Sequence, residues 1–195
     1  MNILKVPHET LLDQVIEGFL QRDRERILSA YQAAYQAHGS YRPALETRDE
    51  GRPTIDHPVR VMYSLYAEQD VRDVDVLCVA LLHDVRELSD EITADDLVER
   101  FGERVAGMVD RLTRKPGQSR ADYAEAIRQA PFEVFLVELA ARLDNLRTAY
   151  RHAKSMQPYY NETRKYFLVH AETLLDRHPG LNTYCSAIRM LLDSD

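Results

Sequence analysis

The chain has 195 residues, of which 45% are apolar, and a formal charge of −7 at pH 7. This length and composition suffice for one compact domain with a core of its own. The negative charge argues against nucleic-acid polymers and anionic membranes as partners, because both require a basic surface, whereas a few converging arginines would still suit a small anionic ligand.

The apolar segments and the first residues carry no recognisable membrane or export signal. The longest strongly apolar run, Val76 to Leu82, is far shorter than the roughly 20 residues of a spanning helix. The start, MNILKVPHET, lacks the sustained apolar region of a secretory signal. We therefore expect a soluble, cytoplasmic protein in which Cys78 and Cys185 are free thiols used for packing.

The helix signals begin near the N-terminus. Glycines and prolines are few, seven and eight, and they fall between segments of helical periodicity, so the sequence predicts an all-α fold. One or two helices are expected between about Glu9 and His38. The polar segment AHGSYRPALETRDEGRPTIDHP then forms a loop that ends at His57, and Pro58 suits the first turn of the next helix.

Capping residues define the middle elements. The helix at Pro58 should end near EQDVRD, after which Asp73 caps a helix that runs through Leu88. The centre of that helix is apolar on every side, which predicts burial. Thr93 and Asp96 resemble a capping box, and they open a short helix that ends at Gly102.

The C-terminal half is predicted to consist of further helices separated by short loops. They are expected at Glu103 to Arg114, Ser119 to Gln129, Pro131 to about His152, about Pro158 to His178, and Leu181 to Leu192. Neither an internal repeat nor a linker divides the chain. Residues 1–195 are therefore expected to form a single domain.

One histidine and aspartate pair carries the strongest chemical signal. His83 and Asp84 are adjacent within the apolar stretch VDVLCVALLHDVREL, and His57 precedes them in TIDHP. Buried imidazole and carboxylate groups are costly without a partner, and together they suit Mn²⁺, Fe²⁺, Co²⁺ or Zn²⁺. On a helix Glu87 shares a face with Asp84 and is placed to handle the proton of a water. A metal of this kind polarises a phosphoryl oxygen, so the pattern predicts hydrolysis of a phosphate ester or anhydride.

Four segments carry a family resemblance. TIDHP, ALLHDVRE, ITADDLVERFGERVAGMVDRLT and ELAARLDNLRTA resemble, in order and spacing, the HD-domain phosphohydrolases, most of all the hydrolase domain of RelA/SpoT-type alarmone enzymes. The match covers roughly Ala33 to Tyr150, flanked by additional helices. It implies a helical bundle with a central metal and nucleotide site. It also implies Mn²⁺-dependent removal of the 3′-pyrophosphate from guanosine tetra- or pentaphosphate, and hence a small nucleotide as the partner.

The resemblance also assigns roles to individual residues. The family metal ligands fall on His57, His83 and Asp84, and the first carboxylate of the catalytic HDxxED motif falls on Glu87. Among the arginines, only Arg42, Arg142 and Arg147 lie beside motif residues. The nucleotide contacts that we predict are Arg42, Asn145 and Arg147.

Two positions depart from the family pattern. The last metal-binding aspartate aligns with Ala141, and the second carboxylate of HDxxED aligns with Leu88. Asp144, one turn after Ala141, or Glu138, one turn before it, is a substitute carboxylate on the same helix face, and we predict Asp144 as the fourth metal ligand. Alternatively, the site has decayed into a nucleotide-binding or structural pocket. A third possibility is that the alanine was introduced deliberately in place of a natural aspartate.

Three functions therefore compete. The first is metal-dependent hydrolysis of a nucleotide phosphate, with guanosine 3′,5′-bis(diphosphate) as the best single substrate. The second is a catalytically silent HD domain that binds a nucleotide or a partner protein, which Ala141 and Leu88 favour. The third is hydrolysis of another phosphomonoester, such as a 5′-nucleotide. The remaining histidines, His38 among them, are predicted to serve packing, capping or the surface.

Overall fold

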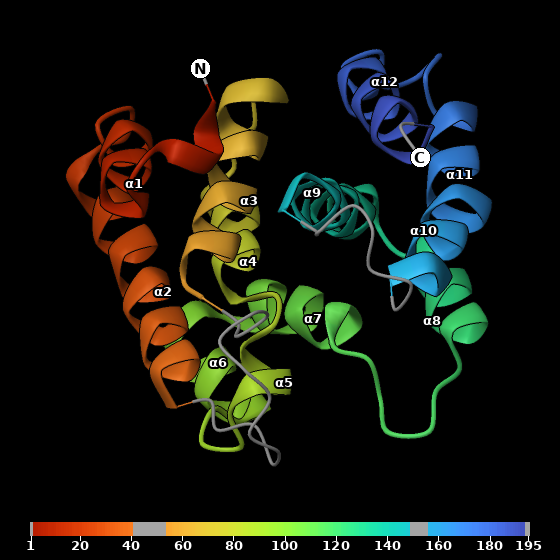
Figure 1. The fold of residues 1–195 in the computed structure, drawn as a ribbon. Coiled ribbons are helices and arrows are strands. Elements are labelled where there is room, and N and C mark those ends of the chain that lie inside the picture. The colour runs from red at the N-terminus through yellow and green to blue at the C-terminus, as the bar shows by residue number, and fades with distance from the viewer. Residues whose placement is uncertain (1, 41–53, 149–155, 194–195) are drawn as a thin grey trace.

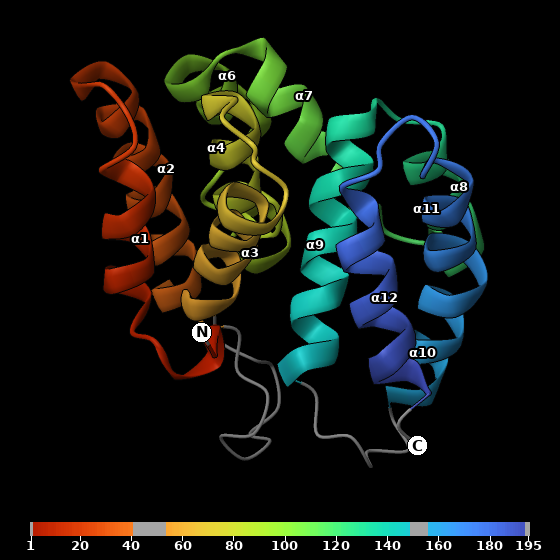
Figure 2. The ribbon, with the colours of Figure 1, turned by 90° about the horizontal axis from the view of Figure 1, so that it is seen from above.

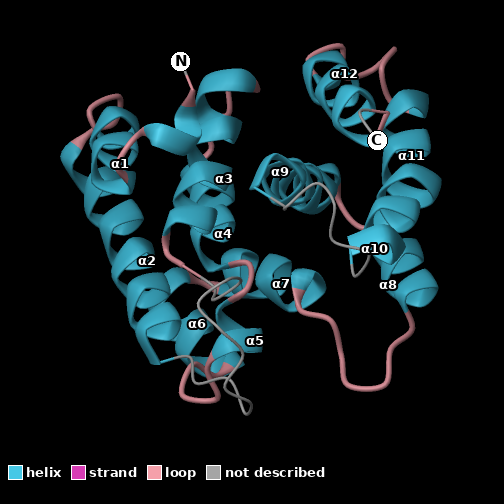
Figure 3. Ribbon diagram, viewed as in Figure 1, coloured by secondary structure: helices cyan, strands magenta, loops and turns pink. Residues whose placement is uncertain are grey.

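The structure is a computed structural model that describes residues 2–40, 54–148 and 156–193. In these ranges it contains helices and loops and no strand (Figure 3). The all-α prediction is therefore confirmed for the described part of the chain.

The helices follow one another in short steps along the chain. The N-terminal helices are η1 (Ile3–Lys5), α1 (His8–Ile16), α2 (Gln21–Ser40), α3 (Asp56–Glu68) and α4 (Val74–Leu82). Next come α5 (Val85–Leu88), α6 (Ala94–Phe101) and α7 (Glu103–Leu112). The C-terminal helices are α8 (Arg120–Arg128), α9 (Phe132–Thr148), α10 (Gln157–Glu162), the π-helical η3 (Thr163–Leu168), α11 (Val169–Thr173) and α12 (Leu181–Leu192).

Helix α9 joins two groups of helices. Figure 1 shows α1 to α4 on one side with α5 to α7 beneath them, and α8 with α10 to α12 on the other side. Helix α9 lies between the first group, α1 to α7, and the second group, α8 with α10 to α12. Figure 2 shows α9 side by side with α12. It packs against α3, α4 and α7 from the first group and against α8 and α12 from the second. Side chains on α9 therefore reach both halves of the molecule.

Helix α4 lies at the centre of the first group. Every residue from Val76 to Leu82 is buried, and the helix packs against α2, α3, α7 and α9. This confirms the prediction of a buried helix. Removing one of its large side chains, as in Leu81→Ala, would cost about 2–5 kcal/mol. The next residue, His83, is thereby held in the interior of the bundle.

The predicted helix starts are confirmed by their capping contacts. The side chains of Asp73, Thr93 and Ser119 each accept a hydrogen bond from a backbone N–H in the first turn that follows. Asp96 completes the capping box with Thr93. Gly102, with φ of +89°, ends α6 in the left-handed region that favours glycine.

The prediction of one helix from Asp73 through Leu88 is wrong at its C-terminal part. Helix α4 ends at Leu82, and His83 and Asp84 form a turn before α5 begins at Val85. Asp84 has φ of −111° and ψ of −2°, which differ clearly from the values of about −63° and −42° in a regular α-helix. The apolar pattern continues across the turn, so hydrophobic periodicity does not reveal the break.

The C-terminal predictions differ from the structure mainly at the helix ends. The helix predicted from about Pro158 is present as α10, η3 and α11, but it ends at Thr173 rather than His178. Helix α9 is described as far as Thr148, and its predicted continuation to His152 lies outside the described residues.

Two further findings concern the apolar residues. Cys78 and Cys185 are free and buried, as predicted. Among the described helices, none is long and apolar enough to cross a membrane.

Candidate metal centre

His57 lies in the first turn of α3, and α9 fixes the orientation of its ring. Its Nδ1 is 2.8 Å from Oδ2 of Asp144. Burial alone raises the pKa of Asp144, but hydrogen bonds from His57 and Arg60 outweigh this effect and hold the pKa below its ordinary value. An ionised carboxylate only accepts hydrogen bonds, so Nδ1 of His57 carries the hydrogen. In a neutral ring, Nε2 then presents a lone pair.

His83 presents its Nε2 in the same way from the turn between α4 and α5. Its Nδ1 donates to the carbonyl oxygen of Ala80 at 2.8 Å. Nε2 of His83 and Nε2 of His57 are 3.2 Å apart. Because both Nδ1 atoms face acceptors, two lone pairs would face each other at this distance, which is repulsive. A proton or a metal ion relieves that repulsion.

Asp84 completes the group. His57, His83 and Asp84 each offer one ligand atom, and these atoms lie within 4.8 Å of one another. Burial alone would raise the pKa of Asp84, but the imidazoles of His83, His38 and His57 hold it below its ordinary value. The sequence therefore places two imidazole nitrogens and an ionised carboxylate around one point.

Unpartnered buried atoms show that this group fits a cation. Oδ1 of Asp84 and both ring nitrogens of His38 are buried and lack a hydrogen-bond partner among the described residues. Nε2 of His38 is 3.4 Å from Oδ1 of Asp84, but without the geometry of a hydrogen bond. Buried polar atoms are normally satisfied, so unpaired atoms beside three ligand groups indicate a site for a bound ion. The imidazole and carboxylate donors suit a divalent transition metal.

Glu87 lies beside this group and contacts the backbone of Arg114. Its Oε1 accepts a hydrogen bond from the backbone N–H of Arg114 at 2.8 Å. The residue is exposed, yet partial burial of its carboxyl raises the pKa, and the carboxylates of Asp84 and Glu138 raise it further. A carboxylate of raised pKa is a stronger base than an ordinary glutamate.

Neither substitute carboxylate joins the ligand group in this structure. Both oxygens of Asp144 are engaged by His57 and Arg60. Glu138 accepts from Nε of Arg142 at 2.7 Å and from the hydroxyl of Tyr123 at 2.9 Å. In this structure Asp144 contacts the Nδ1 side of the His57 ring, and its role as a metal ligand stays a prediction.

The predicted nucleotide contacts have different surroundings. Asn145 donates from Nδ2 to the hydroxyl of Tyr159 at 3.1 Å. Arg147 forms two hydrogen bonds of 3.2 Å with the carboxylate of Glu68, which join α9 to α3. Arg42 lies outside the described residues.

Two residues at the site were not singled out as functional from the sequence. Arg60 lies one helical turn after His57, and that spacing is the one signal that would have placed it on the same face. His38 was predicted to serve packing or capping. Its proximity to Asp84 depends on the packing of α2 against α5, which the sequence does not reveal.

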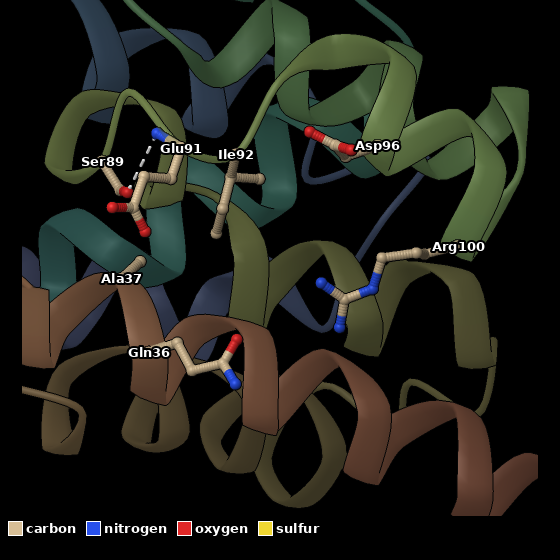
Figure 4. A pocket seen from close by; sticks show the side chains of 7 residues that line it. All are labelled: Gln36, Ala37, Ser89, Glu91, Ile92, Asp96 and Arg100. Atoms are coloured by element: carbon tan, nitrogen blue, oxygen red, sulfur yellow. Dashed lines mark hydrogen bonds between the residues drawn. The ribbon is translucent and has the colours of Figure 1, made fainter.

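A separate cavity opens between α2 and α6 (Figure 4). It has a volume of about 190 Å³ and is lined by Gln36, Ala37, Ser89, Glu91, Ile92, Asp96 and Arg100. None of the three metal-ligand candidates lines it. The cavity and the metal group are therefore distinct features of the structure.

Comparisons with known proteins agree with this geometry. A family model described as HD domain matches residues 30–171. A guanosine-3′,5′-bis(diphosphate) 3′-pyrophosphohydrolase of Aquifex aeolicus is 35% identical over 150 residues, covering 72% of this chain and 20% of the relative. The MESH1 enzyme of Drosophila melanogaster, which bears the same activity name, is 30% identical over 135 residues, covering 67% of this chain and 73% of the relative. The chain thus spans about a fifth of the length of the bacterial relative.

The fold has a solved counterpart. A metazoan orthologue of SpoT, described as hydrolysing ppGpp, superposes with a TM-score of 0.57 and 24% sequence identity, covering 86% of this chain and 92% of the other. This similarity supports the helical architecture. The matched family model, the relatives and the grouped His57, His83 and Asp84 lead to one conclusion: the chain belongs to the HD-domain family and is related to the SpoT and MESH1 type of ppGpp 3′-pyrophosphohydrolase.

Proposed function

We propose that the protein is a metal-dependent phosphohydrolase that removes the 3′-pyrophosphate from guanosine 3′,5′-bis(diphosphate). The observation that carries this proposal is the convergence of His57, His83 and Asp84, whose ligand atoms lie within 4.8 Å of one another. The printed activity of the relatives supplies the substrate. The small anionic nucleotide is compatible with a chain of net charge −7, because only a local cluster of cations is needed to bind it.

In this proposal His57, His83 and Asp84 hold the metal, and Mn²⁺ is the best candidate. A divalent ion at this position would supply a Lewis acid for a phosphoryl oxygen and would lower the pKa of water. The chain itself contributes the orientation of the donors. Hydrogen bonds to Asp144 and to the carbonyl of Ala80 aim Nε2 of each histidine at the same point.

Glu87 is the proposed general base. Its raised pKa and its place beside Asp84 suit the acceptance of a proton from the attacking water. The hydrogen bond from the backbone of Arg114 holds the carboxylate in place while leaving one oxygen available.

The nucleotide contacts of the proposal are Arg42, Asn145 and Arg147. Asn145 and Arg147 lie on the last turns of α9, just beyond Asp144. An arginine binds phosphate well through its fork of donors. In this structure Arg147 pairs with Glu68, so a phosphate would have to compete with that carboxylate for the guanidinium group.

The decisive experiment combines metal content with product analysis. Protein purified without chelator and loaded with Mn²⁺ is analysed by mass spectrometry and incubated with guanosine 3′,5′-bis(diphosphate). We expect near-stoichiometric metal and release of pyrophosphate, and both should be lost in His83→Ala. Release of orthophosphate instead would indicate a phosphomonoesterase. Absence of metal and of turnover in the unaltered protein would overturn the proposal.

The second candidate is a silent HD domain that binds a nucleotide without turnover. The specific observation that favours it is Ala141, which is 5% exposed and packs in the apolar core, together with the partly buried Leu88. Neither side chain can bind a metal. Binding of guanosine 3′,5′-bis(diphosphate) by calorimetry without release of product would support this candidate over hydrolysis.

A further inference from the structure

We infer that Arg60 and Asp144 form a positioning pair that fixes the proton and the ring orientation of His57, so that Nε2 of His57 is always presented to the metal. This inference rests on the proposed function, because it assigns two residues to the metal site proposed there. In this inference Asp144 binds Nδ1 of the ligand His57 and does not itself bind the metal.

The geometry of the three side chains carries the inference. Asp144 is 2% exposed and comes from α9. Its Oδ1 accepts from Nε of Arg60 at 2.8 Å, and its Oδ2 accepts from Nη2 of Arg60 at 3.0 Å and from Nδ1 of His57 at 2.8 Å. Three donors therefore converge on one buried carboxylate, and two of them come from one guanidinium group.

The sequence spacing explains why one carboxylate can reach both donors. His57 and Arg60 are one helical turn apart on α3, so they share a face. That face packs against α9, where Asp144 lies. Arg60 supplies the positive charge that makes a buried carboxylate tolerable, because a buried charge without a partner is strongly unfavourable.

The pair determines the tautomer of His57. The carboxylate offers only acceptors, so the hydrogen of the neutral imidazole stays on Nδ1. Nε2 is then free to bind a cation beside Nε2 of His83, 3.2 Å away. Carboxylates that orient a metal-bound histidine in this way typically contribute about 10- to 100-fold to metal affinity.

The competing role of Asp144 as a ligand makes the opposite prediction for Arg60. As a ligand, Asp144 would first have to leave Arg60 and His57. Removing Arg60 would then free the carboxylate and strengthen metal binding. As a positioning residue, Asp144 needs Arg60, so removal of Arg60 should weaken metal binding.

The test is a titration with Co²⁺ followed by visible absorption and calorimetry, with Arg60→Met, Asp144→Asn and Arg60→Lys. We expect Arg60→Met and Asp144→Asn to weaken Co²⁺ binding by about 10- to 100-fold, with the absorption at saturation unchanged because the ligands are the same. Arg60→Lys should restore part of the affinity. The matched control is Glu68→Gln, which alters the neighbouring ion pair between α3 and α9 and should leave the affinity unchanged.

Three results would overturn the inference: tighter binding in Arg60→Met, equal affinity in all variants, or a changed saturated spectrum in Asp144→Asn. A second measurement remains informative if a variant fails to fold. In the unaltered, metal-free protein, nitrogen NMR of the His57 ring should find a hydrogen on Nδ1, and an Nδ1 without a hydrogen would contradict the positioning pair. If the unaltered protein binds no metal, the proposed function fails, whereas the NMR result still decides the tautomer.

Discussion

Helix α9 borders two buried groups of charged residues, and they differ in how completely their polar atoms are satisfied. Around Arg142 every carboxylate oxygen has a donor. Glu138 accepts from Arg142 and from the hydroxyl of Tyr123, and Glu162 accepts from Arg142 at 2.6 Å and from Arg120 at 3.0 Å. The guanidinium of Arg142 also donates to a threonine hydroxyl and lies 3.6 Å from the centroid of a phenylalanine ring.

The metal group on the other side of α9 is incomplete by comparison. Nε2 of His57 and Nε2 of His83 face each other, while the ring nitrogens of His38 and Oδ1 of Asp84 are buried without a hydrogen-bond partner in the part of the chain that the structure describes. A saturated network holds helices together and needs nothing further. An unsaturated group costs stability unless a ligand completes it. This difference distinguishes a structural cluster from the metal site that we propose.

The largest predicted effect concerns the saturated cluster. Arg142→Ala leaves the carboxylates of Glu138 and Glu162 buried without their shared cation. We expect a loss of about 3–5 kcal/mol in the free energy of unfolding, measured by urea denaturation. An exposed pair provides the control: Arg128, 3.0 Å from Glu125, should change stability by at most about 0.5 kcal/mol in Arg128→Ala. Similar losses in the two variants would remove the basis of the comparison.

The next effect is expected on turnover alone. Glu87→Gln keeps an acceptor for the backbone N–H of Arg114 but cannot take a proton. We expect the rate of pyrophosphate release to fall by about 100-fold or more, with metal affinity and unfolding unchanged. Initial rates with saturating Mn²⁺ measure the effect. An unchanged rate would show that another group accepts the proton.

Much of the fold follows from local sequence signals. The capping residues Asp73, Thr93 and Ser119 act where the sequence predicts them, because capping depends only on neighbouring residues. The break after Leu82 was missed because the apolar pattern continues through it. Local signals therefore predict the helix starts better than the turn that carries His83 and Asp84.

The residues of the candidate site could be predicted from the sequence, but the hydrogen bonds that join them to distant residues could not. The sequence pattern identified His57, His83 and Asp84, and the structure brings them together. The pairing of Asp144 with Arg60 joins positions 84 residues apart in the chain. Such a contact depends on how α9 packs against α3, so local sequence patterns provide no reason to prefer it to the predicted role of Asp144 as a metal ligand.

A smaller effect is expected at Ala141. This residue lies one turn before Asp144 on α9, and an aspartate there would add a carboxylate on the same face. We expect Ala141→Asp to tighten Mn²⁺ binding by about 10-fold, measured by electron paramagnetic resonance of free Mn²⁺. The matched control is Ala140→Asp at an equally buried position, 1% exposed against 5% for Ala141. Equal affinities in the two variants would contradict a site that lacks one ligand.

The smallest effect on stability is expected at His38, beside the metal group. His38 is 5% exposed, and neither of its ring nitrogens has a hydrogen-bond partner within the described ranges, so His38→Leu exchanges a ring without hydrogen bonds for an apolar side chain. In metal-free protein we expect the free energy of unfolding to change by less than about 1 kcal/mol, because the leucine brings no polar atom that needs a partner, while Asp84 loses one of the imidazoles that favour its ionised form. Urea denaturation with chelator present measures this change. A loss of about 2 kcal/mol or more would mean that the His38 ring is satisfied in the folded protein, and the contrast between the two clusters on α9 would then no longer hold.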